Sequence, residues 1–113
     1  MKQLLKIILI GALLGSVGSS VLMADIKKGQ KAYLKTFKSK FKMNGTKFAT
    51  LHTQDEWKEL FKNKGEGFKK EFIKNYPKSE KTLLKKNIWK KLQDVKDFAI
   101  EYANDSGNIP SCG

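Results

Sequence analysis

Residues 25–45, DIKKGQKAYLKTFKSKFKMNG, decide the fold of this chain. Apolar residues recur in this stretch at spacings of seven, four and four, which places them on one face of an α-helix. They are Ile26, Tyr33, Phe37 and Phe41. We expect a helix from Ile26 to about Lys42, with Asp25 as its N-cap and the apolar stripe in the core. Asn44 and Gly45 then supply the turn that ends it.

The strongest local signal further along the chain is Thr53-Gln54-Asp55-Glu56, which has the pattern of a capping box. It predicts a helix from Gln54 to about Lys62, with His52 and Trp57 packed together as a hydrophobic staple across its start. The helix should bury Trp57, Leu60 and Phe61. The connection before it, from Thr46 to His52, should place Phe48 and Leu51 in the core.

Two more helical segments are predicted after the break at Gly65-Glu66-Gly67. One runs from Phe68 to Asn75 and is stopped by Pro77. The last runs from Glu80 to about Ala103, capped by Ser79, with a break near Asn87 left open. Its inward stripe is Leu84, Ile88, Leu92, Val95, Phe98 or Ala99, and Tyr102. Because no segment alternates as a strand would, the chain is expected to be all-α and a single domain.

The first 24 residues have the layout of a secretory signal: two early lysines, an apolar run from Ile7 to Leu14, and small residues up to Ala24. We therefore expect a signal peptide at 1–24, one domain at 25–113 and a periplasmic location. Cleavage after Ala24 would leave 89 of the 113 residues and no integral membrane segment. A cut nearer Ser19, or an uncleaved anchor, stays open because Leu22 is large for its position.

The chain is strongly basic. Its 23 basic residues are all lysine, against 11 acidic residues, and removal of Lys2 and Lys6 with the signal lowers the formal net charge from +12 to +10. Such an excess attracts anionic surfaces and polyanions. The absence of arginine argues against specific nucleic-acid binding, since lysine lacks the planar fork that reads guanine.

Both ends of the predicted domain resemble a class I cytochrome c. The first helix carries Gly29 and Tyr33, and the last helix reads LQDVKDFAIEYA at 92–103, similar to the terminal helix that packs across the first one in that family. HTQDEW at 52–57 and DSGNIPSC at 105–112 also resemble small exported cytochrome c-like proteins of epsilonproteobacteria. The resemblance implies a bundle of about four helices, with the N- and C-terminal helices packed together, and a relationship to electron-transfer haem proteins.

Covalent haem is excluded where the family would attach it. Between Tyr33 and Gly45 there is no cysteine and no histidine, so the C-x-x-C-H motif is missing. Noncovalent haem would have to use His52 and Met43, the sole histidine and the sole methionine after the signal. We expect no cofactor and no metal, because His52 and Glu56 have no further ligands in a cluster. No nucleophile motif or phosphate loop occurs, so we do not expect an enzyme.

Two groups of lysines provide the one positive indication of function. One crowds the end of the first helix and the other surrounds Trp89: Lys35, Lys38, Lys40 and Lys42, then Lys85, Lys86, Lys90 and Lys91. If both share a face, they form a cationic patch with Trp89 as its aromatic centre, suited to an acidic periplasmic protein, anionic lipid or wall polymer. The alternative is an ordinary solvated face. Cys112 is a lone thiol: a free redox thiol, half of an intermolecular bridge, or an incidental remnant of a lost pair.

Overall fold

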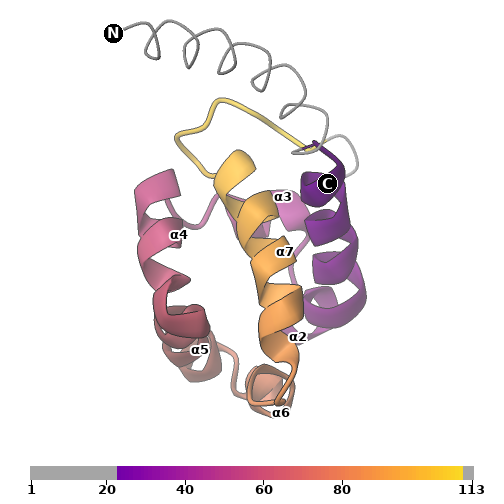
Figure 1. Ribbon diagram of the computed structural model, residues 1–113, viewed down its shortest axis with the longest axis vertical. Coiled ribbons are helices and arrows are strands. Elements are labelled where there is room, and N and C mark those ends of the chain that lie inside the picture. Colours follow the sequence, from indigo (N-terminus) through magenta and orange to yellow (C-terminus); the bar gives the residue numbers. More distant parts are fainter. Residues whose placement is uncertain (1–22, 111–113) are drawn as a thin grey trace, which may run out of the picture.

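The computed structural model describes residues 23–110, and all regular structure in this part of the chain is helical. Figure 1 shows the arrangement: helix α7 (Ile88–Glu101) lies at the centre, with the start of the chain on one side and helices α4 (Gln54–Leu60) and α5 (Lys62–Asn75) on the other. The all-α prediction is confirmed. The predicted signal segment, apart from residues 23 and 24, lies outside the described residues.

The first helical region comprises residues 23–41 and is not one regular helix. Residues 23–32 are α-helical, η1 (Tyr33–Phe37) is a π-helical turn, and α2 (Lys38–Phe41) completes the region. Asp25 is not the N-cap, because residues 23 and 24 are already helical. The region ends at Lys42, which takes a left-handed conformation with φ 56°.

A further short helix, α3 (Gly45–Ala49), fills most of the expected connection. Asn44 begins this helix instead of ending the previous one, since its side-chain oxygen accepts a hydrogen bond of 2.8 Å from the Lys47 N–H. Phe48 is buried as predicted, but Leu51 is 40% exposed. The three residues after the helix turn the chain into α4, and this turn leaves Leu51 on the surface.

Helices α4 and α5 follow each other almost without interruption. The capping box of α4 is confirmed in both directions: Thr53 Oγ1 accepts from the Glu56 N–H, and the Glu56 carboxylate accepts from the Thr53 N–H. The expected break at Gly65–Gly67 falls earlier, where Asn63, Lys64 and Gly65 all have positive φ values of 54°, 58° and 80°. Three successive left-handed residues therefore set the angle between the two helices.

The last predicted helix is divided, as the break near Asn87 allowed. Its parts are η2 (Pro77–Ser79), α6 (Glu80–Leu83) and α7. Ser79 does not cap with its side chain; its hydroxyl donates to the Tyr76 carbonyl at 2.6 Å. Leu84 points outward with 61% of its surface exposed, and Leu83 takes the buried place. The reason is the turn after α6, which interrupts the helical period between Leu83 and Ile88.

The core is aromatic. Trp57 is fully buried, and its indole N–H donates to the Ala49 carbonyl at 2.9 Å. Tyr33 stacks on Phe48 with ring centroids 4.4 Å apart, and further contacts between rings connect all the layers of the bundle. Burial of such rings supplies most of the hydrophobic stabilisation of a domain this small. The fully buried aromatic residues are Tyr33, Phe37, Phe41, Phe48, Trp57, Phe68, Phe72 and Phe98.

The N- and C-terminal helices pack together, as predicted. The rings of Tyr33 and Phe98 lie 6.2 Å apart, so the first helical region crosses α7 in direct contact. The turn after α7 then closes on the start of α4, where Asn104 N–H donates to the His52 carbonyl and Gln54 N–H donates to Asp105 Oδ1. In residues 23–110 no helix has both the length and the apolar character needed to cross a bilayer.

Candidate functional site

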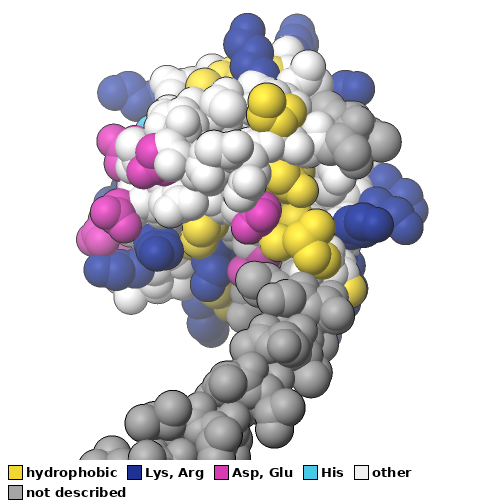
Figure 2. Space-filling view, turned by 90° about the horizontal axis from the view of Figure 1, so that it is seen from above, with side chains coloured by type: hydrophobic (Ala, Val, Ile, Leu, Met, Phe, Trp, Pro, Cys, Tyr) yellow, Lys and Arg dark blue, Asp and Glu magenta, His cyan; other side chains and the backbone are white. Residues whose placement is uncertain are grey.

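All eight lysines of the two predicted groups are exposed. Within residues 23–110, the lysines that lie within 4 Å of a carboxylate are Lys62, beside Glu59, and Lys70, beside Glu66. None of the eight is among them. Their charges therefore face solvent, and Figure 2 shows lysine side chains projecting around the edge of the molecule while acidic side chains gather on one side and near the centre of that view.

The second lysine group touches the first helical region at one point. Lys91 Nζ of α7 lies 3.4 Å from Oγ1 of Thr36, which stands between Lys35 and Lys38 in the sequence. A pocket of about 160 Å³ opens beside this contact. We call it the threonine–lysine pocket; its lining residues are Thr36, Thr82, Lys85, Asn87, Ile88 and Lys91. We call the eight exposed lysines together the lysine surface.

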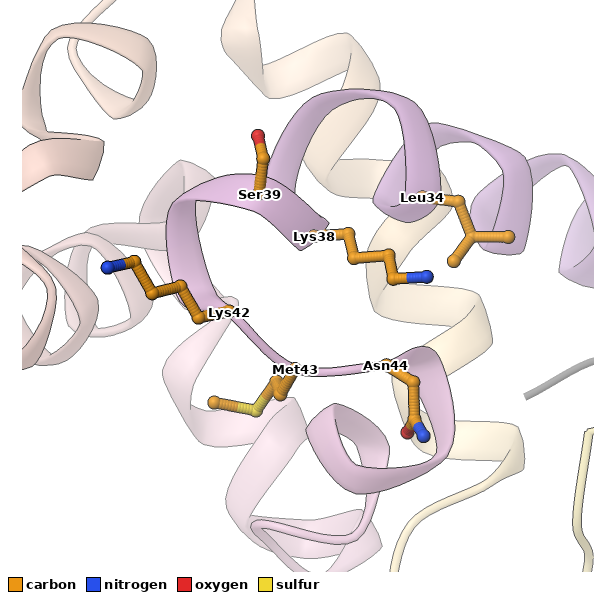
Figure 3. A pocket seen from close by; sticks show the side chains of 6 residues that line it. All are labelled: Leu34, Lys38, Ser39, Lys42, Met43 and Asn44. Carbon is orange, nitrogen blue, oxygen red and sulfur yellow. The ribbon is translucent and has the colours of Figure 1, made fainter.

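Three lysines of the first group border two shallow pockets. Lys38 and Lys42 border one of about 420 Å³ at the bend before α3, where Figure 3 shows Lys42 directed away from Lys38. Lys40 and Lys42 border another of about 210 Å³ against Tyr76 and Lys78. Lys78 therefore extends the lysine surface. The sequence analysis missed it because it follows Pro77 in a different segment, with no periodic relation to the first helix.

Trp89 does not occupy the centre of the lysine surface. It is partly buried against the core, and a Cβ built on Gly65 would lie 3.5 Å from its Cζ3 atom. The ring therefore packs toward the left-handed turn at the start of α5. Lys86 and Lys90 remain exposed on either side of it and line no pocket described here. Trp89 therefore packs α7 against the start of α5, and the prediction that it forms the centre of the lysine patch is wrong.

His52 is held between two carboxylates. Its Nε2 lies 2.6 Å from Glu71 Oε2 and its Nδ1 lies 3.4 Å from Glu56 Oε1. Its ring meets Trp57 edge to face at 4.8 Å, which confirms the predicted staple. The pKa of Glu56 is lowered, first by the hydrogen bond from the Thr53 backbone and also by His52. Glu71 was missed by the sequence analysis, because it reaches His52 from 19 residues away.

The structure does not bring His52 and Met43 into one pocket. His52 lines a pocket with Glu56, Glu59 and Glu71, whereas Met43 lines the one shown in Figure 3. The main chain of Met43 is held separately, by a hydrogen bond of 2.7 Å from the Tyr33 hydroxyl to its carbonyl. Burial raises the pKa of that hydroxyl, so it stays a donor. Noncovalent haem therefore stays a prediction from the sequence.

The described residues contain no group of three or more His, Cys, Asp or Glu side chains close enough together to hold a metal ion. Glu56 and Glu71 face opposite nitrogens of the His52 ring, so they cannot share an ion bound to one of them. Cys112 lies outside the described residues. The lysine surface is thus the candidate site that the geometry defines best.

Comparison with known proteins gives no match to this chain from family models, curated proteins or solved structures.

Proposed function

We propose that the chain is a small periplasmic binding module without catalytic activity, which holds an acidic protein partner or an anionic envelope polymer on its lysine surface. The observation that carries the proposal is the contact of Lys91 with Thr36, because it places the second lysine group beside the helical region that carries the first. None of the eight exposed ammonium groups lies within 4 Å of a carboxylate of residues 23–110, so no close ion pair neutralises them. Such a surface speeds and orients encounter with an anion.

The resemblance to cytochromes c supports the same conclusion by another route. Soluble cytochromes c dock on acidic partners through lysines, and the crossing of the first and last helices agrees with that family. We propose that the lysine surface is such a docking surface, kept in a chain that lacks the covalent haem site. An absorption spectrum of protein purified from the native periplasm tests the remaining haem hypothesis: a Soret band at near-stoichiometric haem supports electron transfer, and a flat visible spectrum rejects it.

Binding to poly-L-glutamate tests the proposal directly. A variant with Lys85, Lys90 and Lys91 replaced by Glu should bind about tenfold more weakly at low ionic strength, since each exposed charge pair contributes on the order of 0.5 kcal/mol. Added salt should also weaken the binding of the unmodified protein to poly-L-glutamate, because it screens the exposed charges.

The matched control replaces three other exposed lysines, Lys28, Lys47 and Lys58, by Glu. Both variants change the net charge by the same amount, so a difference between them reports position. An equal loss in both variants would mean that the protein attracts anions by net charge alone, and the proposed site would be wrong.

A further inference from the structure

We propose that the threonine–lysine pocket binds one tetrahedral oxyanion, the phosphate group of free phosphate or of a phosphorylated lipid headgroup. This inference deepens the proposed function and rests on it. It assigns a specific ligand group to the pocket beside the contact of Lys91 with Thr36.

The pocket presents hydrogen-bond donors and cations from three segments. Lys85 and Lys91 supply two ammonium groups, Thr36 and Thr82 two hydroxyls, and Asn87 an amide. No carboxylate is among its lining residues. Phosphate oxygens accept charge-assisted hydrogen bonds from donors of this kind. The donor set therefore matches an oxyanion and has no acidic residue to repel one.

A larger groove, lined by residues of α5 and by Leu84, differs from the threonine–lysine pocket in size and charge. Its volume is about 670 Å³, and four lysines border it, but Glu66 lies among them, 3.7 Å from Lys70. Ile73 and Leu84 give it an apolar floor. The groove is larger than a single phosphate group needs, and Glu66 offsets part of the positive charge of its lysines. The threonine–lysine pocket is smaller and carries one sign of charge.

Thr82 adds a hydroxyl to the donors of the pocket. Its side chain lines the pocket and keeps 8% of its surface exposed. Among the hydrogen bonds formed by residues 23–110, none uses its hydroxyl, whereas the Thr50 hydroxyl is bonded to two carbonyls. An oxyanion in the pocket would accept the proton of the Thr82 hydroxyl.

Thr36 is oriented by its neighbour. Lys91 Nζ donates to Thr36 Oγ1, so the Thr36 hydroxyl proton remains free to be donated to a ligand. The same contact holds the ammonium group of Lys91 at the rim of the pocket. A ligand would thus meet a cation and a hydroxyl whose relative positions are already set.

The start of α7 adds a favourable field. The helix has 14 residues, its N-cap Asn87 makes no side-chain capping bond, and no acidic residue lies in its first turn. The positive end of the helix dipole is therefore uncompensated beside the pocket. Asn87 lines the pocket with its side chain free of that capping role.

Titration of the purified protein with inorganic phosphate, followed by NMR chemical shifts and calorimetry, tests the inference. We expect saturable binding that Thr82→Val and Lys91→Met each weaken about tenfold. Thr82→Val keeps the shape of the side chain and removes only the hydroxyl. Lys58→Met, which removes an equal charge from an exposed lysine outside the lysine surface, should change affinity less than twofold. Thr36→Val provides the same readout if Thr82→Val does not fold.

Two further arms separate the ligand sources and the two proposals. The first arm compares binding of the protein to vesicles of phosphatidic acid in neutral lipid with binding to neutral vesicles. Binding to the phosphatidic acid vesicles that inorganic phosphate competes away identifies a lipid headgroup as the ligand. Binding of inorganic phosphate without binding to these vesicles identifies the free anion. Poly-L-glutamate binding should survive Thr82→Val. Absence of saturable phosphate binding with poly-L-glutamate binding intact, or equal losses in Thr82→Val and Lys58→Met, would overturn the oxyanion site and leave the proposed function standing.

Discussion

Gly29 lies directly against the main chain of Asp94. A Cβ atom on Gly29 would stand 1.9 Å from the Asp94 carbonyl oxygen and 2.9 Å from Cβ of Phe98. No side-chain adjustment can relieve a contact with a backbone carbonyl. The absence of a side chain at Gly29 is therefore what lets the first helical region cross α7 at this distance.

Gly29→Ala should separate these two helices and destabilise the fold by about 3 kcal/mol or more, the upper part of the range for overpacked cores. Chemical denaturation with circular dichroism measures the change. Gly67→Ala is the matched control inside α5, where the nearest atom is the flexible Leu60 Cδ2 at 3.3 Å. Its effect should stay within about 1 kcal/mol, because the gain in helix propensity offsets the tight contact. Equal losses in the two variants would contradict the importance of the crossing.

A glycine in the left-handed turn at the start of α5 should stabilise the protein. Lys64 has φ 58°, and a non-glycine residue in this conformation costs about 1–2 kcal/mol. Lys64→Gly should therefore raise the free energy of unfolding by about 0.5–1 kcal/mol, after the extra entropy of glycine in the unfolded chain is subtracted. Lys70→Gly, the same replacement at a regular helical position of α5, should lower it by about 1 kcal/mol. If the turn has this conformation, thermal unfolding should show a higher midpoint for Lys64→Gly and a lower midpoint for Lys70→Gly.

Glu56 should contribute to acid denaturation. Its pKa is lower in the folded protein than the ordinary value of 4.5, so the unfolded chain binds the proton more tightly. The stabilisation is present above the unfolded pKa and is lost as pH falls through the folded pKa, below about 4.5. Glu56→Gln keeps the capping bond and removes the titration, so its stability should fall less between pH 5 and 3. Glu59→Gln on the same helix controls for the loss of one charge, and an identical pH profile in both variants would refute the assignment.

Asp97 should act in the opposite direction. Its pKa is raised mainly by burial, with Lys96 lowering it and the carboxylates of Asp25 and Asp94 raising it. The folded chain therefore binds this proton more tightly, and the ionised carboxylate weakens the fold at neutral pH. Asp97→Asn should raise the midpoint of thermal unfolding at neutral pH, and the gain should vanish as the pH falls below 3.8. A gain that persists in acid would point to packing rather than charge.

The sequence was sufficient where one short segment determines the structure. The capping box at Thr53–Glu56 depends on residues three apart, so its pattern predicted the start of α4 correctly. The aromatic stripe of the first helical region is likewise a local pattern, and its members are buried. The crossing of the first and last helices came from the resemblance at Gly29 and Tyr33, and the structure confirms it.

Features that depend on angles between helices were beyond the sequence. Leu83 and Leu84 are adjacent and equally apolar, and only the turn after α6 decides that Leu83 is buried. The approach of Glu71 to His52 depends on the bend at Asn63–Gly65. The contact of Lys91 with Thr36 places the second lysine group beside the first helical region, and no spacing in the sequence predicts it.

The hydrogen bonds from the turn after α7 to the start of α4 have a consequence for the order of events during synthesis. The helix that meets Gly29 and the turn that meets His52 are made after the segments they contact, so the first helical region and the start of α4 leave the ribosome before these partners exist. Short isolated helices are marginal in water. The contact at Gly29 and the hydrogen bond at His52 therefore form only after α7 and the turn behind it have been synthesised.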